Sequence, residues 1–199
     1  MRWLAELRTF ARPGRPEEPP PAPGELAPDE SAGAAGPRLV IFLRHAGCPF
    51  AEDTVLAVEA RRRQWPSAPA VLYSEAEPPE LKRWLRAIGA QGSAVRADPG
   101  AFDRWRVPRT SPGHFLGPRS LRGVVRLRRR GIRNRYPSGT RWRSAAAFVV
   151  DGDGRVAWRH LPVHAADPLP VETVFSRLTD LTAHGGGGPA ADSAEGPYA

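Results

Sequence analysis

The sequence predicts an α/β domain, a central mixed sheet flanked by helices, with an arginine-rich insertion before a late β-hairpin. The first observation is a set of short apolar runs, typical of strands buried on both faces, at residues 39–43, 70–73 and 145–150. The second is a helical pattern after each of the first two runs, so that strands and helices alternate. The third is the turn sequence 151–154, Asp-Gly-Asp-Gly, which predicts a hairpin with a strand over residues 155–160.

Each predicted helix has its own start or stop signal. Pro49 suits the first position of a helix, and Pro66 ends it. A second helix is predicted over residues 79–88, where Gly89 stops it, and a short strand follows at residues 94–97. Pro170 opens a last helix, in which apolar residues recur at helical spacing.

Composition narrows the class of protein. The chain has 199 residues, 41% of them hydrophobic and 25% charged, which is typical of a globular protein. No run approaches the roughly 18 apolar residues of a membrane span, and residues 1–8 lack the apolar core of a signal peptide. Cys48 is the single cysteine, which excludes an internal disulfide and a multi-cysteine zinc site. We therefore expect a reducing, cytoplasmic location.

The chain divides into three parts. Residues 1–36 are rich in Pro, Gly and Ala, and are predicted to form an N-terminal segment and a flexible or partly extended linker. Residues 37–183 form the predicted domain, with the insertion at residues 101–143. Residues 184–199 begin with a run of glycines and predict a disordered tail.

Cys48 stands where the first strand gives way to the first helix, and open α/β sheets bind ligands at such a position. The reactive form of cysteine is the thiolate, which a helix N-terminus and nearby cations stabilise. Arg44 and His45 would add positive potential, whereas Glu52 and Asp53 would oppose it if they turned toward the sulfur. The competing interpretation makes Cys48 a buried small hydrophobe, Arg44 a salt-bridge partner and His45 a surface or hydrogen-bonded residue.

Residues 39–50 resemble the active-site segment of peroxiredoxin-like (AhpC/TSA-related) proteins of the thioredoxin superfamily. In that group a strand ends in a Phe-Leu-Arg-His-x-Gly-Cys-Pro-x-Cys type of motif. The matching residues here are Phe42, Leu43, Arg44, His45, Gly47, Cys48 and Pro49. A second match covers residues 131–135, Gly139, Trp142 and residues 148–156. The resemblance implies a thioredoxin-like fold over residues 37–183, thiol redox chemistry, and no metal or organic cofactor.

The sequence departs from this pattern at several positions. Ala51 replaces the second cysteine of the dithiol form, and His45 stands where peroxidatic sites carry Thr or Ser. The resemblance therefore implies a one-cysteine site, with Cys48 as the nucleophile and Arg44 and His45 tuning or orienting it. The residues expected to line this site are Gly47, Pro49, Trp142 and Arg143.

Two functions follow from these observations. In the first, Cys48 reduces a peroxide to leave a sulfenic acid, or exchanges with an external thiol through a mixed disulfide. The expected partners are then a small-molecule oxidant and a low-molecular-weight or protein thiol. In the second, the domain is a non-catalytic thioredoxin-fold module whose insertion binds an acidic partner.

The insertion is strongly basic, because no acidic residue lies between Asp103 and Asp151. A helix is predicted over residues 116–130 within it. The candidate anion- or partner-binding residues are Arg128, Arg129, Arg130, Arg133 and Arg135. These arginines could equally form a solvated helix face. Nucleic acid is not favoured, because no nucleic-acid motif accompanies the interleaved aromatic residues.

Two other motifs are weak. The Asp-Gly-Asp-Gly sequence at residues 151–154 lacks the later Glu of a calcium loop. His160 and His164 have the i, i+4 spacing of helix-borne ligands, but Pro162 between them argues against a helix. No metal site is therefore expected.

Overall fold

The sheet of this computed structural model is mixed, as the sequence predicts. The structure describes residues 18–28, 36–64, 70–90, 95–110, 114, 117–135, 137–139 and 142–183. The strands are β1 (Arg38–Phe42), β2 (Ala70–Ser74), β3 (Val95–Ala97), β4 (Ala146–Val150) and β5 (Val156–His160). They lie in the order β3-β2-β1-β4-β5, where β1, β2 and β3 run parallel and β4 and β5 are antiparallel to their neighbours.

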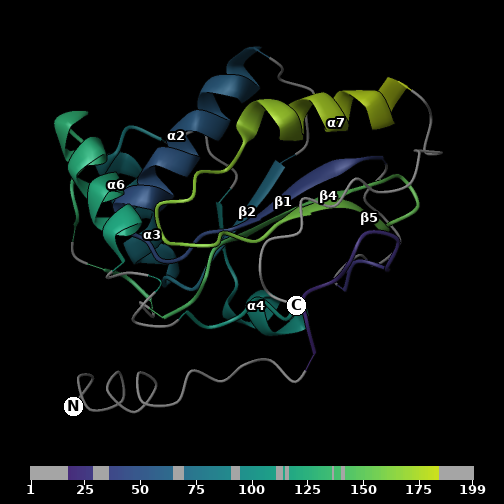
Figure 1. Cartoon of the computed structure of the whole chain (residues 1–199), viewed down its shortest axis with the longest axis horizontal. Coiled ribbons are helices and arrows are strands. Elements are labelled where there is room, and N and C mark those ends of the chain that lie inside the picture. Colours follow the sequence, from purple (N-terminus) through teal and green to yellow (C-terminus); the bar gives the residue numbers. More distant parts are fainter. Residues whose placement is uncertain are drawn as a thin grey trace.

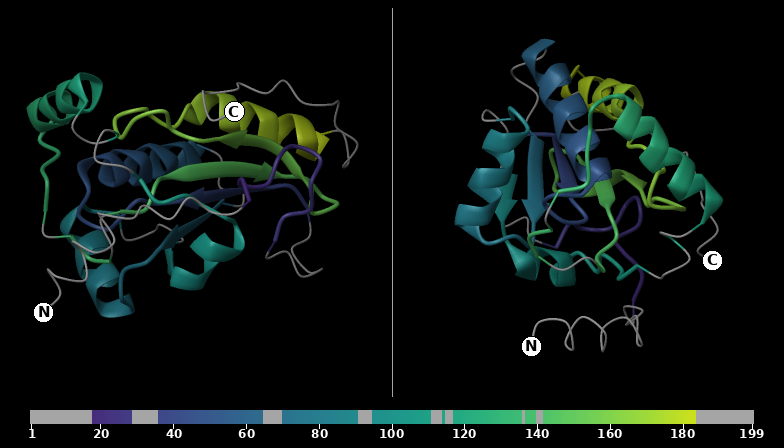
Figure 2. Two further views of the ribbon diagram at one scale, coloured as in Figure 1. Left: turned by 60° about the horizontal axis from the view of Figure 1, so that its bottom comes forward. Right: turned by 90° about the vertical axis from the view of Figure 1, so that its left-hand side faces the viewer.

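Helices cover both faces of the sheet (Figure 1). They are α2 (Pro49–Gln64), α3 (Pro78–Ala87), α4 (Pro99–Arg104), α6 (Pro118–Arg129) and α7 (Val171–Ala183). The long helices α2 and α7 lie side by side over one face, and the short α4 lies under the other (Figures 1 and 2). The sequence predicted every helix of this set except α4, which has too few residues to show a helical period. The predicted disordered tail, residues 184–199, lies outside the described residues.

Strand β1 is buried on both faces, which explains its unbroken apolar sequence. Leu39 and Ile41 join the cluster beneath α2, α3 and α7, while Val40 and Phe42 join the cluster with α4. The second cluster is aromatic, and the ring of Phe42 lies 5.0 Å from that of Phe102. Because β1 is the central strand, the loop after it emerges between helices at the carboxyl end of the sheet.

Residues 18–28, within the segment predicted as a flexible or partly extended linker, form a strap along the edge of the sheet. Antiparallel hydrogen bonds hold it: the Gly24 N–H donates to the Val156 carbonyl at 2.8 Å, and the Val156 N–H donates to the Glu25 carbonyl at 2.9 Å. Backbone hydrogen bonds and arginine side chains hold the strap in place. It does not need alternating apolar side chains, so its sequence lacks the periodicity that predicts a strand. The sequence alone therefore could not predict this contact with β5.

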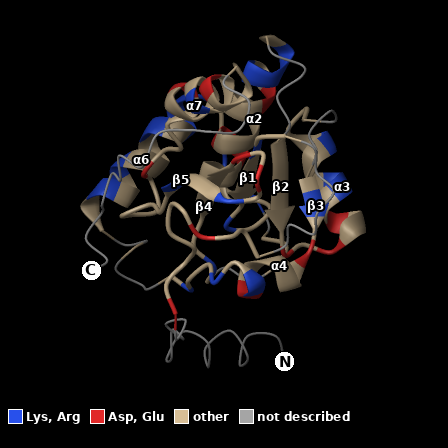
Figure 3. Cartoon of the chain, turned by 90° about the vertical axis from the view of Figure 1, so that its right-hand side faces the viewer, with Lys and Arg blue, Asp and Glu red and all other residues tan. Residues whose placement is uncertain are grey.

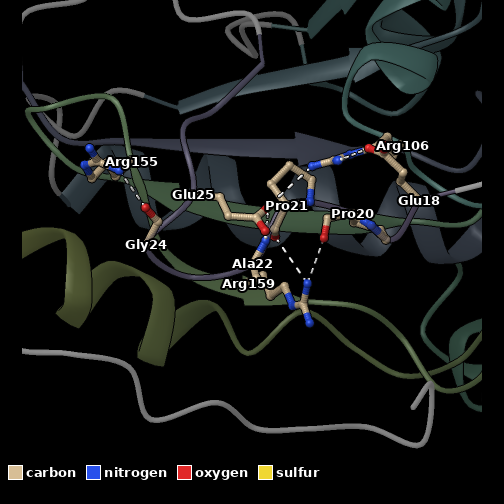
Figure 4. A network of polar contacts seen from close by, with 9 residues as sticks. All are labelled: Glu18, Pro20, Pro21, Ala22, Gly24, Glu25, Arg106, Arg155 and Arg159. Atoms are coloured by element: carbon tan, nitrogen blue, oxygen red, sulfur yellow. Dashed lines mark hydrogen bonds and ion pairs between the residues drawn. The ribbon is translucent and has the colours of Figure 1, made fainter.

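Three arginines fasten the strap (Figure 4). Arg155 donates to the Gly24 carbonyl at 2.8 Å, and Arg159 donates to the Pro20 carbonyl at 2.8 Å. Arg106 reaches Glu18 at 2.6 Å and Glu25 at 3.4 Å. Its φ of 55° is left-handed, and its N–H and that of the next residue close the C-terminus of α4 in a Schellman pattern. The end of α4 thus directs a cation toward the strap.

Replacing Arg106 with Ala removes both ion pairs. Ala, like Arg, carries a Cβ, so the substitution does not relieve the left-handed backbone conformation as Gly would. We expect faster hydrogen exchange at the strap amides of Gly24 and Ala27, and a loss of global stability of less than about 1 kcal/mol, because exposed ion pairs contribute little. Exchange measured by NMR and urea unfolding test this. Arg119→Ala, an equal loss of charge on α6, is the control; equal exchange in both variants would contradict the prediction.

Candidate thiol site

Cys48 lies at the N-terminus of α2, as the sequence predicts. The chain turns at Gly47, whose φ of 91° favours glycine. The Cys48 N–H then donates to the His45 carbonyl at 3.3 Å, and the Cys48 carbonyl accepts the first helical hydrogen bond from Glu52 at 2.9 Å. Pro49 is the first residue of the helix. Cys48 is therefore the N-cap residue, with its sulfur next to the free N–H groups of the first turn.

The thiol is 1% exposed, yet its surroundings favour the thiolate. Burial is the largest influence and raises the pKa of Cys48. The charge of His45 and its hydrogen bond to the sulfur oppose this, together with the charge of Arg44 and the N–H of Ala51. The net result is a pKa lowered from the ordinary 9.0 to about 6. Burial alone would fit a small hydrophobic residue, whereas a lowered pKa is typical of reactive cysteines in general.

His45 is buried, and its ring is fixed from within the loop. Its Nδ1 lies 3.0 Å from the Ala46 carbonyl oxygen. Because a carbonyl can only accept, Nδ1 carries the proton of this hydrogen bond. The structure therefore rules out a surface position for His45. Arg44 is half-buried and lines a cavity described below.

The two sequence segments that resemble one family lie against each other in the structure. The Arg135 N–H donates to the Gly47 carbonyl at 2.9 Å, and the Ser138 N–H donates to the Ala46 carbonyl at 3.0 Å. Gly139 has a φ of 87°, and a Cβ there would lie 3.2 Å from the backbone of Ala76. The segment after α6 is thus a wall of the Cys48 loop.

Two carboxylates near the start of α2 are paired with arginines from the predicted insertion. Arg135 Nε lies 3.2 Å from Glu52 Oε2, and Arg130 Nη1 lies 2.8 Å from Asp53 Oδ1. The sequence analysis expected these carboxylates to oppose the positive potential at Cys48. Each of them is instead paired with a cation. The other candidate arginines, Arg128, Arg129 and Arg133, are exposed.

The structure does not bring Arg143 to the thiol. Its guanidinium lies 2.7 Å from Glu75 and 2.6 Å from Asp103, and it stacks 5.4 Å from the centre of the Phe102 ring. Phe102 belongs to the cluster on the α4 face, whereas Cys48 belongs to the cluster on the α2 face. Arg143 instead ties the end of α4 to the loop after β2. Trp142 is half-buried, and its carbonyl accepts a hydrogen bond from Thr110 at 2.6 Å.

A cavity of about 70 Å³ adjoins the Cys48 loop, and sequence reasoning did not find it. It lies between the ends of β1 and β4, helix α2 and the loop from β5 to α7, and most of its lining is apolar. Its polar lining residues include Arg44, His114, His160 and Asp167. These residues are far apart in sequence, so no motif could have revealed the group.

The histidines of this cavity favour the neutral form. Burial, with the charges of Arg44 and His164, lowers the pKa of His114 to about 4, although Asp167 opposes the change. Burial likewise lowers the pKa of His160, against the effect of Asp167, whose Oδ2 lies 3.9 Å from His160 Nε2.

In the described part of the chain, no group of three or more His, Cys, Asp or Glu side chains is placed to hold a metal ion. Among the same residues no helix is long and apolar enough to cross a membrane.

The neutral His114 makes the fold sensitive to acid. Because its folded-state pKa of about 4 lies below the ordinary 6.5, the unfolded chain binds more protons between these values. The stability contributed by the neutral ring is complete above pH 6.5 and is lost as the pH falls toward 4. As the pH falls over this range, the free energy of unfolding should decrease in both proteins. We expect the decrease to be roughly 1–3 kcal/mol smaller in His114→Gln than in the native chain. Urea unfolding at several pH values measures it, and parallel pH profiles would contradict it.

Comparison with solved structures identifies the fold. A peroxiredoxin-like protein from Aquifex aeolicus matches with a TM-score of 0.58 and 16% identity, over 82% of this chain and 90% of its own. A thiol peroxidase from Chromobacterium violaceum matches with a TM-score of 0.52 and 17% identity, over 81% of this chain and 88% of its own. No family model and no curated protein matches the sequence. The predicted thioredoxin-like fold is confirmed, while the insertion at residues 101–143 stays a prediction.

Proposed function

We propose that this protein is a thiol-dependent redox protein of the peroxiredoxin-like group, in which the Cys48 thiolate reduces a peroxide. The observation that carries the proposal is the place of the buried Cys48 thiol at the N-terminus of α2, beside His45 and Arg44; the pKa lowered to about 6 agrees with it. A cysteine with this pKa is mostly thiolate at neutral pH, and the thiolate is the nucleophile. The fold shared with a peroxiredoxin-like protein and a thiol peroxidase supports the same chemistry.

The reaction begins with attack of the Cys48 sulfur on the terminal oxygen of a hydroperoxide. An S–O bond forms, the O–O bond breaks, and the alkoxide that leaves takes up a proton to become an alcohol. The sulfur is oxidised to a sulfenic acid and the peroxide is reduced. His45, held beside the sulfur, is the group placed to supply that proton.

An external thiol completes the cycle, because Ala51 replaces the second cysteine of the dithiol motif and the sequence has one cysteine. The first thiol condenses with the sulfenic acid to give a mixed disulfide and water. A second thiol then attacks that disulfide, releasing the Cys48 thiolate and an oxidised dithiol product. The reductant is therefore a low-molecular-weight or protein thiol, which fits a cytoplasmic protein.

Two measurements on the folded protein test this function. The rate of Cys48 alkylation should rise to a plateau with a midpoint near the pKa of about 6, because only the thiolate reacts. Intact mass after dilute peroxide should show one added oxygen atom, which an added thiol removes. Cys48→Ser should lose peroxide consumption entirely. Alkylation only after unfolding, or equal peroxide consumption by the variant, would refute the proposal.

A second candidate function is the binding of an acidic protein partner by helix α6. The outward face of α6 combines exposed apolar residues, Leu121 (54% exposed) and Val125 (51% exposed), with Arg122 and Arg129 beside them. Basic residues recur along this helix (Figure 3), which contains no acidic residue. A partner with acidic and apolar side chains would complement both properties.

Fluorescence anisotropy with a labelled peptide rich in Glu and Leu tests this second function. We expect binding that weakens with salt and that falls at least about tenfold in a Leu121→Ser, Arg129→Gln variant, because both the apolar contact and a charge are lost. Cys48→Ser should bind as the native chain does. Binding that is insensitive to the α6 changes, or no binding at low salt, would exclude this surface.

A further inference from the structure

The first turn of α2 presents an electrostatic problem for a thiolate. Acidic residues favour a helix N-terminus, because they complement its dipole. A carboxylate near the sulfur, however, disfavours ionisation of the thiol. Glu52 lies in the turn that Cys48 caps, with Asp53 directly after it, and the Glu52 side chain is 5% exposed. A buried carboxylate without a partner is also costly in itself.

We propose that Arg135, assisted by Arg130, is a positioning residue for Cys48: the two arginines neutralise Glu52 and Asp53 near the start of α2, and Arg135 fixes the loop that presents the sulfur. The inference rests on the proposed thiol function and gives two of the arginines that follow α6 a role in it. Neither arginine is placed to touch a substrate in this role; both act through Glu52 and Asp53.

Arg135 holds the chain on both sides of Cys48. Its backbone N–H donates to the carbonyl of Gly47, one residue before the thiol, at 2.9 Å. Its side-chain Nε lies 3.2 Å from Glu52, four residues after the thiol. Arg135 therefore holds the turn before Cys48 through its backbone, and it pairs with the carboxylate after Cys48 through its side chain.

Arg130 makes the weaker contact of the two. Its Nη1 lies 2.8 Å from Asp53 Oδ1, but its side chain is 59% exposed, so water and salt screen the pair. Arg135 pairs instead with a buried carboxylate, where screening is smaller. We therefore expect most of the effect on the thiol from Arg135 and little from Arg130.

Charged and titratable groups at the Cys48 junction come from three elements, and the adjoining cavity adds His114, Arg126, His160 and Asp167. The loop after β1 supplies Arg44 and His45, helix α2 supplies Glu52 and Asp53, and the end of α6 and the chain beyond it supply the two arginines of the proposal. Removing Arg135 leaves the Glu52 carboxylate uncompensated, which disfavours the thiolate. Removing the carboxylate leaves the Arg135 cation uncompensated, which favours it. Removing both restores the balance.

The test is the pH profile of Cys48 alkylation in Arg135→Gln, Glu52→Gln and the double variant. We expect the midpoint to rise by about one pH unit in Arg135→Gln, to fall in Glu52→Gln, and to return near the native value in the double variant. A merely structural role would not give opposite shifts that cancel. Arg119→Gln, an exposed charge on α6, is the matched control and should leave the midpoint unchanged.

Circular dichroism and thermal unfolding show whether each variant folds. If Arg135→Gln does not fold, Glu52→Gln still decides, since it keeps the backbone hydrogen bond from Arg135 to Gly47 and its midpoint must fall. An unchanged midpoint in Glu52→Gln, or an equal shift in Arg119→Gln, would overturn the proposal. Alkylation needs no peroxide, so a chain that shows these shifts but consumes no peroxide would refute the proposed function and leave this inference standing.

Discussion

Burial of an ionisable thiol is the constraint on which the arrangement around α2 depends. Removing Cys48 from water disfavours its charged form, and burial is the largest single influence on its pKa. The native surroundings reverse that influence with one histidine, one arginine and one backbone N–H, all within four residues of Cys48 in the sequence. Arg135 and Arg130, from a distant part of the chain, pair with the carboxylates near the start of the same helix. The junction therefore combines local charges with charges brought from elsewhere in the sequence.

The topology of the sheet explains how those charges arrive. Because β1 is central, the loop that follows it has chain on both sides: the segment after α6 hydrogen-bonds to its backbone, and the connection from β5 to α7 encloses the neighbouring cavity. Gly123 allows α6 to approach, since a Cβ there would lie 2.3 Å from that of Ala166 and 3.1 Å from the Phe50 ring. The close packing of α6 on the start of α2 sets the reach of the arginines that follow it.

Local sequence signals predicted the strands, the longer helices and the position of Cys48, because each rests on the period of apolar residues or on a helix start. They could not predict which face of the sheet a loop residue would join. Arg143 was expected at the thiol. It instead bridges Glu75 and Asp103 on the α4 face, where its guanidinium also lies over the Phe102 ring. The pairing of Glu52 with Arg135 joins residues that are 83 positions apart, and no local pattern encodes such a contact. The cavity was missed for the same reason.

The strap has a consequence for how copies of this chain meet one another. A sheet edge with free N–H and C=O groups is a template for adding another strand, and such edges promote aggregation. Residues 24–27 occupy the first part of the β5 edge with their own hydrogen bonds. The strap is in turn a poor template, because Pro19, Pro20, Pro21 and Pro23 have no N–H to offer an incoming strand. At the other edge β3 has only three residues. The prolines that make this segment resemble a linker therefore also leave few N–H groups along the strap with which a strand of another copy could pair.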